Sequence, residues 1–548
     1  MDGIKINDRI AKEYRQAGYW TDETLGSCWA NSVAKFGGRE FVVDDRGTRN
    51  TYSQLDAHAN ALAARLEALG IRVGDVVTIQ ITPRSEFVIA LIACIKIGAV
   101  PAPLGLCFVE EELLGLLKKL NSRLHIATSD YHGEDRAKML LGLKPRLEQL
   151  NSLIFLGENS KELAKSHSFV SSFESILAAG GAPKTASPAK SDDVGLILCT
   201  SGTTKGSKAV VFTHNNIIFS ERSFNEYYGL TEEDSIFMPA PLNHATGLHH
   251  GIISPMLRGG RLVLQEKFYC REAIELMNRE KCSYSMGATP FIYDILKQLE
   301  ASGETLPSLK FYICGGAPVP PELVRNAYEK QNILVCESYG STESVPHVGV
   351  KPEECLENAG LWSGKALPGI EIRIVDKNHK PVPPGVEGEE ASRGPNLFIG
   401  YLGAPELTAE ALDEEGWFYS GDLAVGDENG NIRIVGRIKD IIIRGGENLN
   451  SNHINDNLEG CPGVSDHAVI GMPDERLGER ICAFIVPENS EKPITKEEII
   501  TFLQAKKIHK RHWPEAVEII DAIPRTESGK VKKNLLSEEL KRRMKGGA

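Results

Sequence analysis

The stretch that decides the fold runs from Val194 to Asn216 and reads Val-Gly-Leu-Ile-Leu-Cys-Thr-Ser-Gly-Thr-Thr-Lys-Gly-Ser-Lys-Ala-Val-Val-Phe-Thr-His-Asn-Asn. Its two apolar runs flank a loop rich in hydroxyl groups and glycine, which predicts a strand, a loop, and a second short strand leading into a helix. Small residues let backbone N–H groups approach an anion, and Lys208 adds positive charge. The loop is therefore a candidate phosphate site. A surface turn has the same composition, however, and the Walker pattern is not matched.

The bulk composition is that of an ordinary globular chain. Its 548 residues exceed what one hydrophobic core supports, so we expect two to four domains or subdomains. The formal net charge of −12 argues against non-specific binding to nucleic acid. The eleven cysteines show no zinc-type spacing and suit a reducing compartment. Because the first residues lack a signal-peptide core and no apolar run spans a bilayer, we expect a cytoplasmic protein without a stable membrane anchor.

Strand-like and helix-like segments alternate along the first half of the chain. Residues 50–73 have the apolar spacing of a helix, and the runs at 76–81, 124–127 and 152–156 have the composition of buried strands. This alternation predicts an α/β fold. Residues 158–192 are polar and weakly patterned, so we expect a surface excursion there.

Three further strands each run into a turn of small or polar residues. These turns begin at Gly287, Gly315 and Glu337. In open α/β sheets, ligands bind beyond the carboxyl ends of the strands. The three turns are therefore candidate binding loops.

The pattern of apolar and turn-forming residues changes in the last third of the chain. Short alternating strands and Gly/Pro turns predict a β-rich subdomain over about residues 360–436. Residues 437–548 then read as a separate α/β unit. We predict a large N-terminal domain over residues 1–436 and a smaller C-terminal domain over 437–548.

Five motifs in one order identify a family. They are Thr200-Ser-Gly-Thr-Thr204, Tyr339-Gly-Ser-Thr-Glu343, Tyr419-Ser-Gly-Asp422, Gly436-Arg-Ile-Lys-Asp440 and Pro524-Arg-Thr-Glu-Ser-Gly-Lys530. Together they closely resemble the adenylate-forming superfamily of acyl-CoA synthetases, luciferases and peptide-synthetase adenylation domains, over roughly residues 20 to 540. The resemblance implies two α/β subdomains plus a distorted β-barrel in the large domain, and a mobile C-terminal α/β domain.

The resemblance also implies the chemistry and a nucleotide site. A carboxylate attacks the α-phosphorus of ATP, which requires positioning and electrostatic stabilisation. The implied nucleotide residues are Thr200, Ser201, Gly202, Thr203, Thr204 and Lys208 at the β- and γ-phosphates, Gly315, Gly316 and Ala317 along the adenine, Tyr339 on its other face with Gly340 and Ser341 beside it, Asp422 at the ribose, and Arg437 at ribose or phosphate.

The remaining roles concern catalysis, domain movement and CoA. Thr342 would bind the α-phosphate, Glu343 would hold Mg²⁺, and Lys530 would bridge the substrate carboxylate and the α-phosphate. His244 resembles a gating residue at the acyl pocket, and Lys439 resembles the hinge of the C-terminal domain. The implied CoA contacts are Arg444, Gly445, Gly446 and Lys510.

Plainer interpretations exist for each residue taken alone. Asp422 could be a turn aspartate, Glu343 a helix cap and Lys530 a solvated lysine. The ordered set of motifs favours the functional roles. His249 and His250 have no carboxylate or cysteine at ligand spacing, so we expect no metal site there.

The chain departs from the family pattern at several positions. Lys205, Ser207 and Ala209 stand where the family commonly has Gly, Pro and Gly, so pyrophosphate affinity is the property that these departures put in question. His453-Ile-Asn455 replaces a Glu-Val/Ile-Glu run, which puts the local packing of the C-terminal domain in question.

The acyl substrate is indicated by a subgroup resemblance. Segments such as Pro239-Ala-Pro-Leu-Asn-His-Ala-Thr-Gly look most like bacterial short/medium-chain fatty acid and cyclohexanecarboxylate CoA ligases. The residues assigned to the acyl pocket are Met238, Leu248, Gly287, Ala288 and Val345. None carries a charge, which favours an uncharged acyl group. We expect a monomer or homodimer whose ligands are a small carboxylic acid, ATP and CoA. A free-standing enzyme that loads a carrier protein, or a non-catalytic nucleotide-binding member, would share most of these motifs.

Overall fold

The computed structural model describes residues 4, 6–106, 108–184, 189–200, 207–316, 319–444, 447–474, 477–526 and 529–546. These residues belong to two compact units. The first lies within Met1–Ser201, Ser207–Glu371 and Ser392–Phe418, and the second within Ile372–Ala391 and Tyr419–Ala548. The α/β fold expected from the sequence is confirmed, whereas the division after residue 436 stays a prediction.

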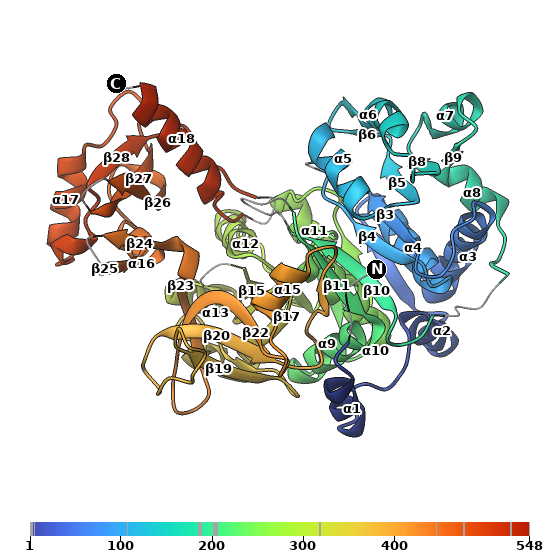
Figure 1. Ribbon diagram of the computed structural model, residues 1–548, viewed down its shortest axis with the longest axis horizontal. Helices are drawn as coiled ribbons and strands as arrows, with labels where there is room; N and C mark the ends of the chain where they lie inside the picture. Colours follow the sequence, from blue (N-terminus) through green and yellow to red (C-terminus); the bar gives the residue numbers. More distant parts are fainter. Residues whose placement is uncertain are drawn as a thin grey trace. The chain divides into compact units, whose positions relative to one another are not determined.

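A nine-stranded sheet forms the centre of the first unit, as far as the structure describes it (Figure 1). Across the sheet the strands are β18 (Lys365–Ala366), β17 (Val345–Gly349), β16 (Leu334–Ser341), β15 (Phe311–Gly315), β14 (Tyr284–Gly287), β12 (Ser235–Met238), β13 (Arg261–Leu264), β1 (Glu40–Asp44) and β2 (Arg49–Thr51). Strands β1, β13, β12, β14, β15 and β16 are parallel. Their carboxyl ends therefore meet at one edge, which brings the predicted binding turns together.

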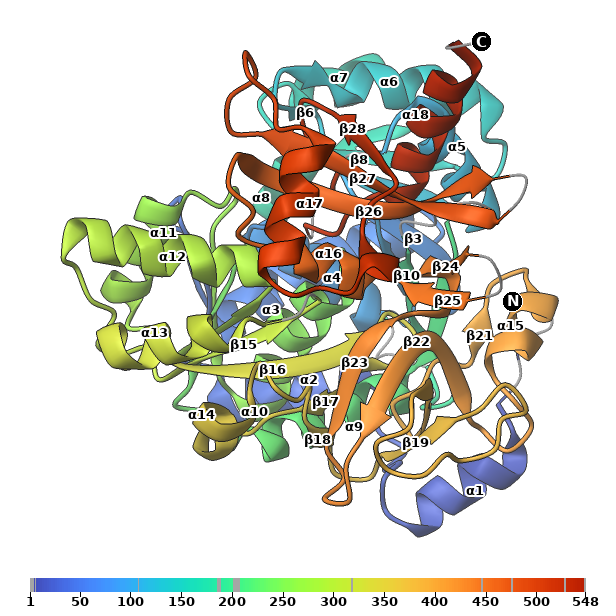
Figure 2. The same cartoon turned by 90° about the vertical axis from the view of Figure 1, so that its left-hand side faces the viewer.

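Helices α11 (Cys270–Glu280), α12 (Thr289–Ser302) and α13 (Pro321–Gln331) alternate with strands β13 to β16 along this sheet (Figure 2). Helix α12 packs on β15, and α13 packs on β16. Each of the two helices starts with a proline in its first turn, where the missing N–H costs no hydrogen bond. The crossovers thus hold the strand ends in parallel register.

A second, parallel sheet occupies the N-terminal part of the first unit. Its order is β4 (Val100–Pro103), β3 (Val76–Gln80), β5 (Leu124–Thr128), β8 (Ser152–Leu156) and β9 (Val170–Ser172). In helix α4 (Ser85–Lys96), every residue from Phe87 to Ile95 is buried. The helix contacts β1 of the first sheet as well as β3 and β4. A helix that is apolar all round needs such a buried place between layers.

The expectation for residues 158–192 was wrong in part. This segment contains α7 (Ser160–Ser166), β9 and α8 (Phe173–Ala179), and β9 pairs with β8. Phe173 is fully buried, and α8 packs against α3 (Tyr52–Ala68). Helices of seven residues show too few apolar repeats for their period to be recognised in a polar sequence.

The stretch from Val194 to Asn216 forms the two strands and the helix start that its sequence predicts, as far as the structure describes it. Strands β10 (Val194–Cys199) and β11 (Ala209–Thr213) form an antiparallel hairpin, and β21 (Gly400–Tyr401) pairs with β11. Helix α9 (His214–Tyr227) follows directly. Its N-cap, Thr213, accepts a hydrogen bond from Asn216 N at 3.2 Å, and the Asn216 side chain bonds back to Thr213 N at 3.0 Å.

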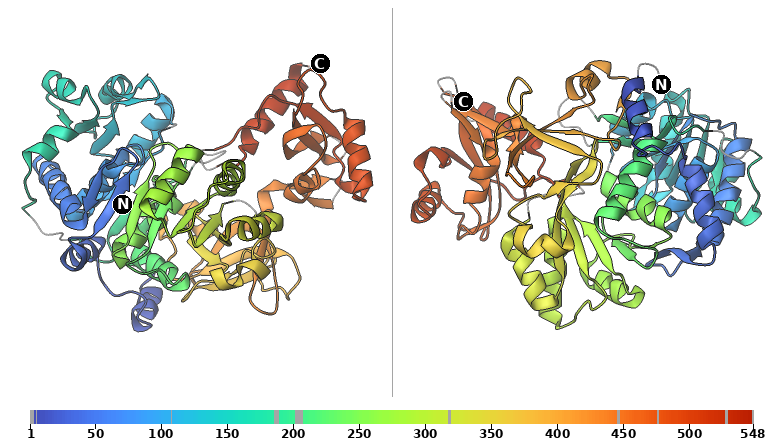
Figure 3. Two further views of the ribbon diagram at one scale, coloured as in Figure 1. Left: turned by 180° about the vertical axis from the view of Figure 1, so that it is seen from behind. Right: turned by 90° about the horizontal axis from the view of Figure 1, so that it is seen from below.

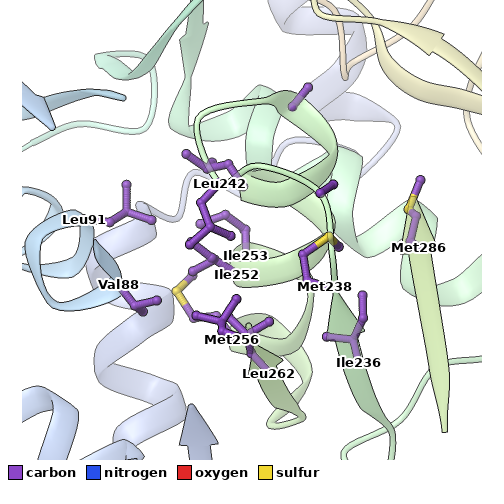
Figure 4. Close-up of a cluster of buried hydrophobic side chains, with 14 of the residues drawn as sticks. Val88, Leu91, Ile236, Met238, Leu242, Ile252, Ile253, Met256, Leu262 and Met286 are labelled. Carbon is purple, nitrogen blue, oxygen red and sulfur yellow. The ribbon is translucent and has the colours of Figure 1, made fainter. Parts of the chain in front are cut away.

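A π-helix, η2 (Thr246–Ile253), packs on the nine-stranded sheet and continues into α10 (Ser254–Arg258). It contacts β12, β14 and β17. Figure 4 shows Ile252 and Ile253 in the same buried cluster as Met238 on β12 and Met286 on β14. A Cβ on Gly247 would lie 2.2 Å from Pro241 O, so this wide turn closes onto the preceding loop only with glycine. π-turns of this kind are frequent at functional sites.

The other elements of the first unit connect or cover these layers. They are α1 (Asp8–Gln16), α2 (Leu25–Phe36), α5 (Glu110–Lys119), β6 (Asp130–Tyr131), β7 (Glu134–Asp135), α6 (Arg136–Leu143), η1 (Lys144–Arg146), η3 (Pro352–Glu354), α14 (Cys355–Asn358) and α15 (Pro405–Ala411).

The second unit consists of two sheets with helices (Figure 3, orange to red). One sheet has the order β19 (Glu371–Val375), β20 (Gly388–Arg393), β22 (Phe418–Gly426) and β23 (Ile432–Arg437). The other has the order β25 (Glu447–Asn450), β24 (Ile441–Arg444), β27 (Gly478–Pro487) and β26 (Val464–Asp474), with β28 (Ala516–Ile519) on β27. The remaining elements are η4 (Ile438–Asp440), α16 (Ser451–Asn457), α17 (Lys496–Ala505), η5 (Lys510–His512) and α18 (Lys533–Gly546).

The second sheet of this unit is buried on both faces. Val469 and Ile481 belong to one core with Leu503 of α17, whereas Ile470 and Phe484 belong to another core. The alternation follows from the two-residue repeat of a strand. Ile454 of the divergent 453–455 segment is 1% exposed in the first of these cores, so the altered run still packs.

Candidate active site

The adenine-binding residues expected from the sequence lie at the carboxyl edge of the nine-stranded sheet. Gly315, at the end of β15, lies opposite Ser338 of β16, and an added Cβ would approach Ser338 O to 3.0 Å. Gly316 has a φ of +86°, which favours glycine. Tyr339 follows Ser338, and its ring lies 5.4 Å from that of His347. The strand end is thus lined by glycine, with an aromatic ring on the neighbouring strand. Ala317 lies outside the described residues.

The turn between β16 and β17 presents Thr342 and Glu343. The Ser341 hydroxyl accepts hydrogen bonds from Glu343 N at 3.2 Å and from Ser344 N at 3.3 Å, which fixes the turn. Val345 closes it with a φ of +53°, a conformation that is strained for a β-branched residue. Such strain persists where the surrounding structure imposes it, most often at functional sites.

Tyr401, which was not among the predicted site residues, joins this turn to Lys208 at the β10–β11 hairpin. The Lys208 ammonium donates to Tyr401 Oη at 3.1 Å, and Tyr401 Oη donates to Glu343 Oε1 at 2.7 Å. Tyr401 is 2% exposed; burial and then the neighbouring Glu343 charge raise the pKa of its hydroxyl well above the ordinary value. The only sequence signal was a short Ile399-Gly-Tyr401 run, which pairing with β11 turns into a strand.

The described ends of the phosphate loop form a closed hairpin. Thr200 N donates to Lys208 O at 2.9 Å, and the Ser207 hydroxyl donates to Thr200 O. Lys119 Nζ donates to Ser207 O at 2.6 Å. Ala209, where the family commonly has glycine, sits fully buried in β11. The expected contacts Ser201, Gly202, Thr203 and Thr204, and the divergent Lys205, lie outside the described residues.

The residues assigned to the acyl pocket lie around the π-helix η2. Met238 and Leu248 are each 1% exposed and Val345 is fully buried, while Gly287 ends β14 beside Ala288. His244 stands just before the helix, where its Nδ1 accepts from Thr246 N at 3.4 Å and its carbonyl accepts from Leu248 N at 3.0 Å. His244 is half-buried, in contrast to the two histidines that follow it.

His249 and His250 have a carboxylate partner that sequence spacing could not reveal. Glu221 of α9 accepts from His250 Nδ1 at 2.9 Å, and its other oxygen lies 3.4 Å from His249 Nδ1. All three side chains are fully buried. Burial alone would raise the pKa of Glu221, but His250 and His249 outweigh it and lower the pKa to about 2. Among the described residues, no group of three or more His, Cys, Asp or Glu is arranged to hold a metal ion.

The candidate ribose residues meet in the second unit. Asp422 of β22 lies directly opposite Arg437 of β23, and Arg437 Nε is 2.8 Å from Asp422 Oδ1. The side chain of Asp422 is 6% exposed and that of Arg437 42%. Glu389 Oε1 accepts from Gly421 N at 2.8 Å, which fixes the turn before Asp422.

Lys439 and Lys530 are both exposed in the second unit. Lys439 belongs to the short helix η4, where the neighbouring Asp440 is held by Lys533 Nζ at 3.0 Å. Lys530 follows a tight turn: Thr526 N donates to Lys530 O at 2.8 Å, and Gly529 has a φ of +82°.

The residues assigned to CoA also belong to the second unit. Arg444 forms a two-pronged ion pair with Glu515, at 2.9 and 2.8 Å, so its guanidinium is held in the fold. Lys510 opens the short helix η5 and is exposed. Gly445 and Gly446 lie outside the described residues.

Comparisons with known proteins identify the family. The family model described as AMP-binding enzyme matches residues 29–402, and the AMP-binding enzyme C-terminal domain matches residues 453–530. The chain is 40% identical over 541 residues to the medium-chain fatty-acid–CoA ligase of Escherichia coli (strain K12), covering 99% of this chain and 94% of that protein. It is 32% identical over 517 residues to a feruloyl-CoA synthase of Amycolatopsis sp, covering 93% and 98%.

Among solved structures, ATP-bound MatB from Rhodopseudomonas palustris matches with a TM-score of 0.83 at 26% identity, over 95% of this chain and 99% of that chain. Both the family models and the full-length relatives span the two units. The chain therefore belongs to the AMP-binding enzyme family and is an AMP-forming acyl-CoA synthetase, which joins a carboxylic acid to CoA through an acyl-adenylate made from ATP.

Proposed function

We propose that the enzyme activates an uncharged short- or medium-chain acid, or an alicyclic acid of the cyclohexanecarboxylate type. The observation that carries this proposal is the buried apolar neighbourhood of the π-helix η2. Met238 and Met286 lie on the paired strands β12 and β14, and both are 1% exposed. Thioethers adapt to apolar groups of varied shape. The E. coli relative, a medium-chain fatty-acid–CoA ligase, supports the same substrate class.

The residues assigned to the acyl group include one that packs closely on η2. An added Cβ on Gly251 of η2 would lie 2.9 Å from Met238 Cγ, so the helix and the methionine are packed tightly. A hydrophobic pocket distinguishes substrates by about 1–3 kcal/mol per methylene. We therefore expect activity on a group of related acids, with a maximum at one chain length or ring size.

In the first half-reaction, the substrate carboxylate attacks the α-phosphorus of ATP and pyrophosphate leaves. We assign Lys530 to the carboxylate and the α-phosphate, Thr342 to the α-phosphate, and Lys208 to the departing phosphates. Asp422 would accept hydrogen bonds from the ribose hydroxyls, aided by Arg437. These groups act through position and charge, which are the main sources of catalysis in phosphoryl chemistry.

The donor set fits Mg²⁺ in the way this cation is usually bound with nucleotides. Mg²⁺ takes one or two carboxylates together with phosphate oxygens. Glu343 supplies one half-buried carboxylate at the binding edge, and the hydrogen bond from Tyr401 uses only part of its acceptor capacity. When bound, Mg²⁺ would offset the negative charge of the triphosphate.

In the second half-reaction, CoA displaces AMP to give the thioester. We propose that the C-terminal domain, residues 437–548, turns about Lys439 between the half-reactions, with His244 gating the acyl pocket and Lys510 contacting CoA phosphates. Lys439 lies in the short helix η4, which directly follows β23 and precedes β24, so it stands at the start of the segment proposed to turn.

The cysteines bear on the compartment in which the enzyme works. The ten cysteines in the described ranges are free thiols, which supports our proposal of a reducing, cytoplasmic location. In the part of the chain that the structure describes, no helix is long and apolar enough to cross a membrane.

A CoA-dependent AMP-release screen tests the proposed substrate. The panel contains linear C4–C12 acids, cyclohexanecarboxylate, benzoate and a C6 dicarboxylate at equal concentration. We expect the highest kcat/KM for a linear medium-chain or alicyclic acid and little activity with the dicarboxylate. A preference for the dicarboxylate or for benzoate would contradict the proposal.

A further inference from the structure

The segment from Asn396 to Leu402 connects the hairpin next to Lys208 with the turn that carries Glu343, two regions that belong to separate sequence motifs. On one side, Ile399 N donates to Val211 O and Leu402 N to Ala209 O, both at 2.9 Å. These bonds add the segment to the hairpin that carries Lys208. The segment is therefore fixed to the exit of the phosphate loop.

The same segment is also fixed to the turn that carries Glu343. Phe398 N donates to Glu343 O at 2.9 Å, and Asn396 Nδ2 donates to Ser344 O at 2.5 Å. Asn396 and Phe398 are each 1% exposed. One rigid stretch of backbone thus sets the distance between the two loops.

The side chain of Tyr401 completes this connection. Its hydroxyl donates to Glu343 Oε1 at 2.7 Å and accepts from Lys208 Nζ at 3.1 Å, while the same ammonium lies 4.4 Å from the centre of the phenol ring. The phenol is neutral at ordinary pH. A neutral group that both donates and accepts therefore stands between a cation and an anion.

We propose that Tyr401 is a positioning residue that holds Lys208 and Glu343 apart in the pose they need for the triphosphate and its cation. The proposal rests on the function assigned above to Lys208 and Glu343. Without the hydroxyl, the ammonium and the carboxylate are close enough to move into a direct ion pair. Each would then neutralise the partner that the nucleotide requires, because the lysine must bind phosphate and the carboxylate must bind a cation.

Tyr401→Phe separates this role from simple packing. The substitution removes only the hydroxyl and keeps the ring, which packs at 4.9 Å from Phe398 and beneath the ammonium. If Tyr401 only filled space, the variant would bind nucleotide as the unchanged enzyme does. Tyr328→Phe is the matched control, because Tyr328 is 41% exposed on α13, away from the residues assigned to the site.

The test measures binding directly as well as catalysis. Calorimetric titration with ATP in EDTA reports on Lys208, and Mn²⁺ binding by EPR in the presence of a non-hydrolysable ATP analogue reports on Glu343; neither needs an acyl substrate. We expect Tyr401→Phe to weaken both by about 10-fold and to raise KM for MgATP in pyrophosphate exchange, at an unchanged melting temperature. In a Lys208→Met background no ammonium remains to pair with Glu343, so adding Tyr401→Phe there should cause little further loss of Mn²⁺ affinity.

Unchanged ATP and Mn²⁺ binding in Tyr401→Phe would overturn the proposal. So would a loss of Mn²⁺ affinity on Tyr401→Phe that is equally large in the unchanged enzyme and in the Lys208→Met background, or a loss that follows a lower melting temperature. A failure of the acyl screen leaves these binding measurements intact, so it would contradict the proposed substrate and not the role of Tyr401.

Discussion

Asp422 and Arg437 face each other across the β22–β23 pairing, with Arg437 Nε 2.8 Å from Asp422 Oδ1. The aspartate is buried, whereas the arginine is half-buried. The pair belongs to two different sequence motifs, Tyr419–Asp422 and Gly436–Asp440, which strand pairing brings into contact. A buried carboxylate oriented by one cation is preorganised to accept two hydroxyl hydrogen bonds.

Asp422→Asn tests the ribose assignment. The amide keeps the size of the side chain but replaces one acceptor oxygen with a donor. Since hydrogen bonds to charged groups contribute about 1.5–3 kcal/mol, we expect KM for ATP to rise by at least 10-fold. Initial rates of acid-dependent pyrophosphate exchange measure this. Glu428→Gln, an exposed change in the turn between the same strands, is the control and should leave KM unchanged.

Lys530→Ala should remove adenylate formation while ATP binding remains. The lysine is exposed, and its backbone closes a tight turn with Thr526 that alanine can also form. Loss of one preorganised transition-state contact costs about 10²–10³-fold in rate. Pyrophosphate exchange and calorimetric ATP binding check the two halves of the prediction. Exchange that survives in the variant would mean that another group contacts the α-phosphate.

Glu221→Gln should destabilise the enzyme rather than alter its chemistry directly. Glu221 is fully buried between His249 and His250, and removing one charge from such a cluster costs about 3 kcal/mol. Urea unfolding at pH 7 measures the free energy. Glu226→Gln lies on the same helix but is exposed, so it should change stability by less than about 0.5 kcal/mol.

Glu337 should make stability depend on pH near neutrality. Burial raises the pKa of this carboxyl to about 7, although bonds from Ser363 Oγ at 3.0 Å and Gly360 N at 3.2 Å oppose the shift. A raised carboxyl pKa favours the protonated form in the folded state. Its contribution to stability is complete below about pH 4.5 and is lost as the pH rises through about 7.

Glu337→Gln keeps a neutral side chain in this place at every pH. We therefore expect its melting temperature to vary less than that of the unchanged enzyme between pH 5 and pH 8. The exposed Glu353→Gln should keep the original profile. If Glu337→Gln left the pH profile unaltered, another group would be responsible for it.

Residues 333–345 show how much the sequence could predict about the site. The apolar run from Ile333 to Cys336 indicated a strand, which β16 bears out. The turn expected from Glu337 was placed too early, because β16 continues to Ser341 and the turn begins at Thr342. The positive φ of Val345 was not predictable, because local sequence favours an extended valine and only pairing with Ser341 imposes the turn.

Residues 158–192 and His249–His250 show where prediction from sequence failed. The short helices α7 and α8 are stabilised by burial against other elements, which composition does not report. Glu221 reaches the two histidines from α9, 29 residues before His250, and the distance in sequence carries no sign of this contact. Packing of the π-helix against α9 decides it.

The sequence by itself determined the α/β fold, the family and the residue types that the chemistry needs. These follow from local period, turn composition and the order of motifs, all of which are properties of neighbouring residues. The tertiary structure alone decided which distant groups meet: Lys208 with Glu343 through Tyr401, Asp422 with Arg437, and Glu221 with two histidines. Strand register and close packing fix those distances, because side chains far apart in sequence have no preferred geometry until the backbone brings them together.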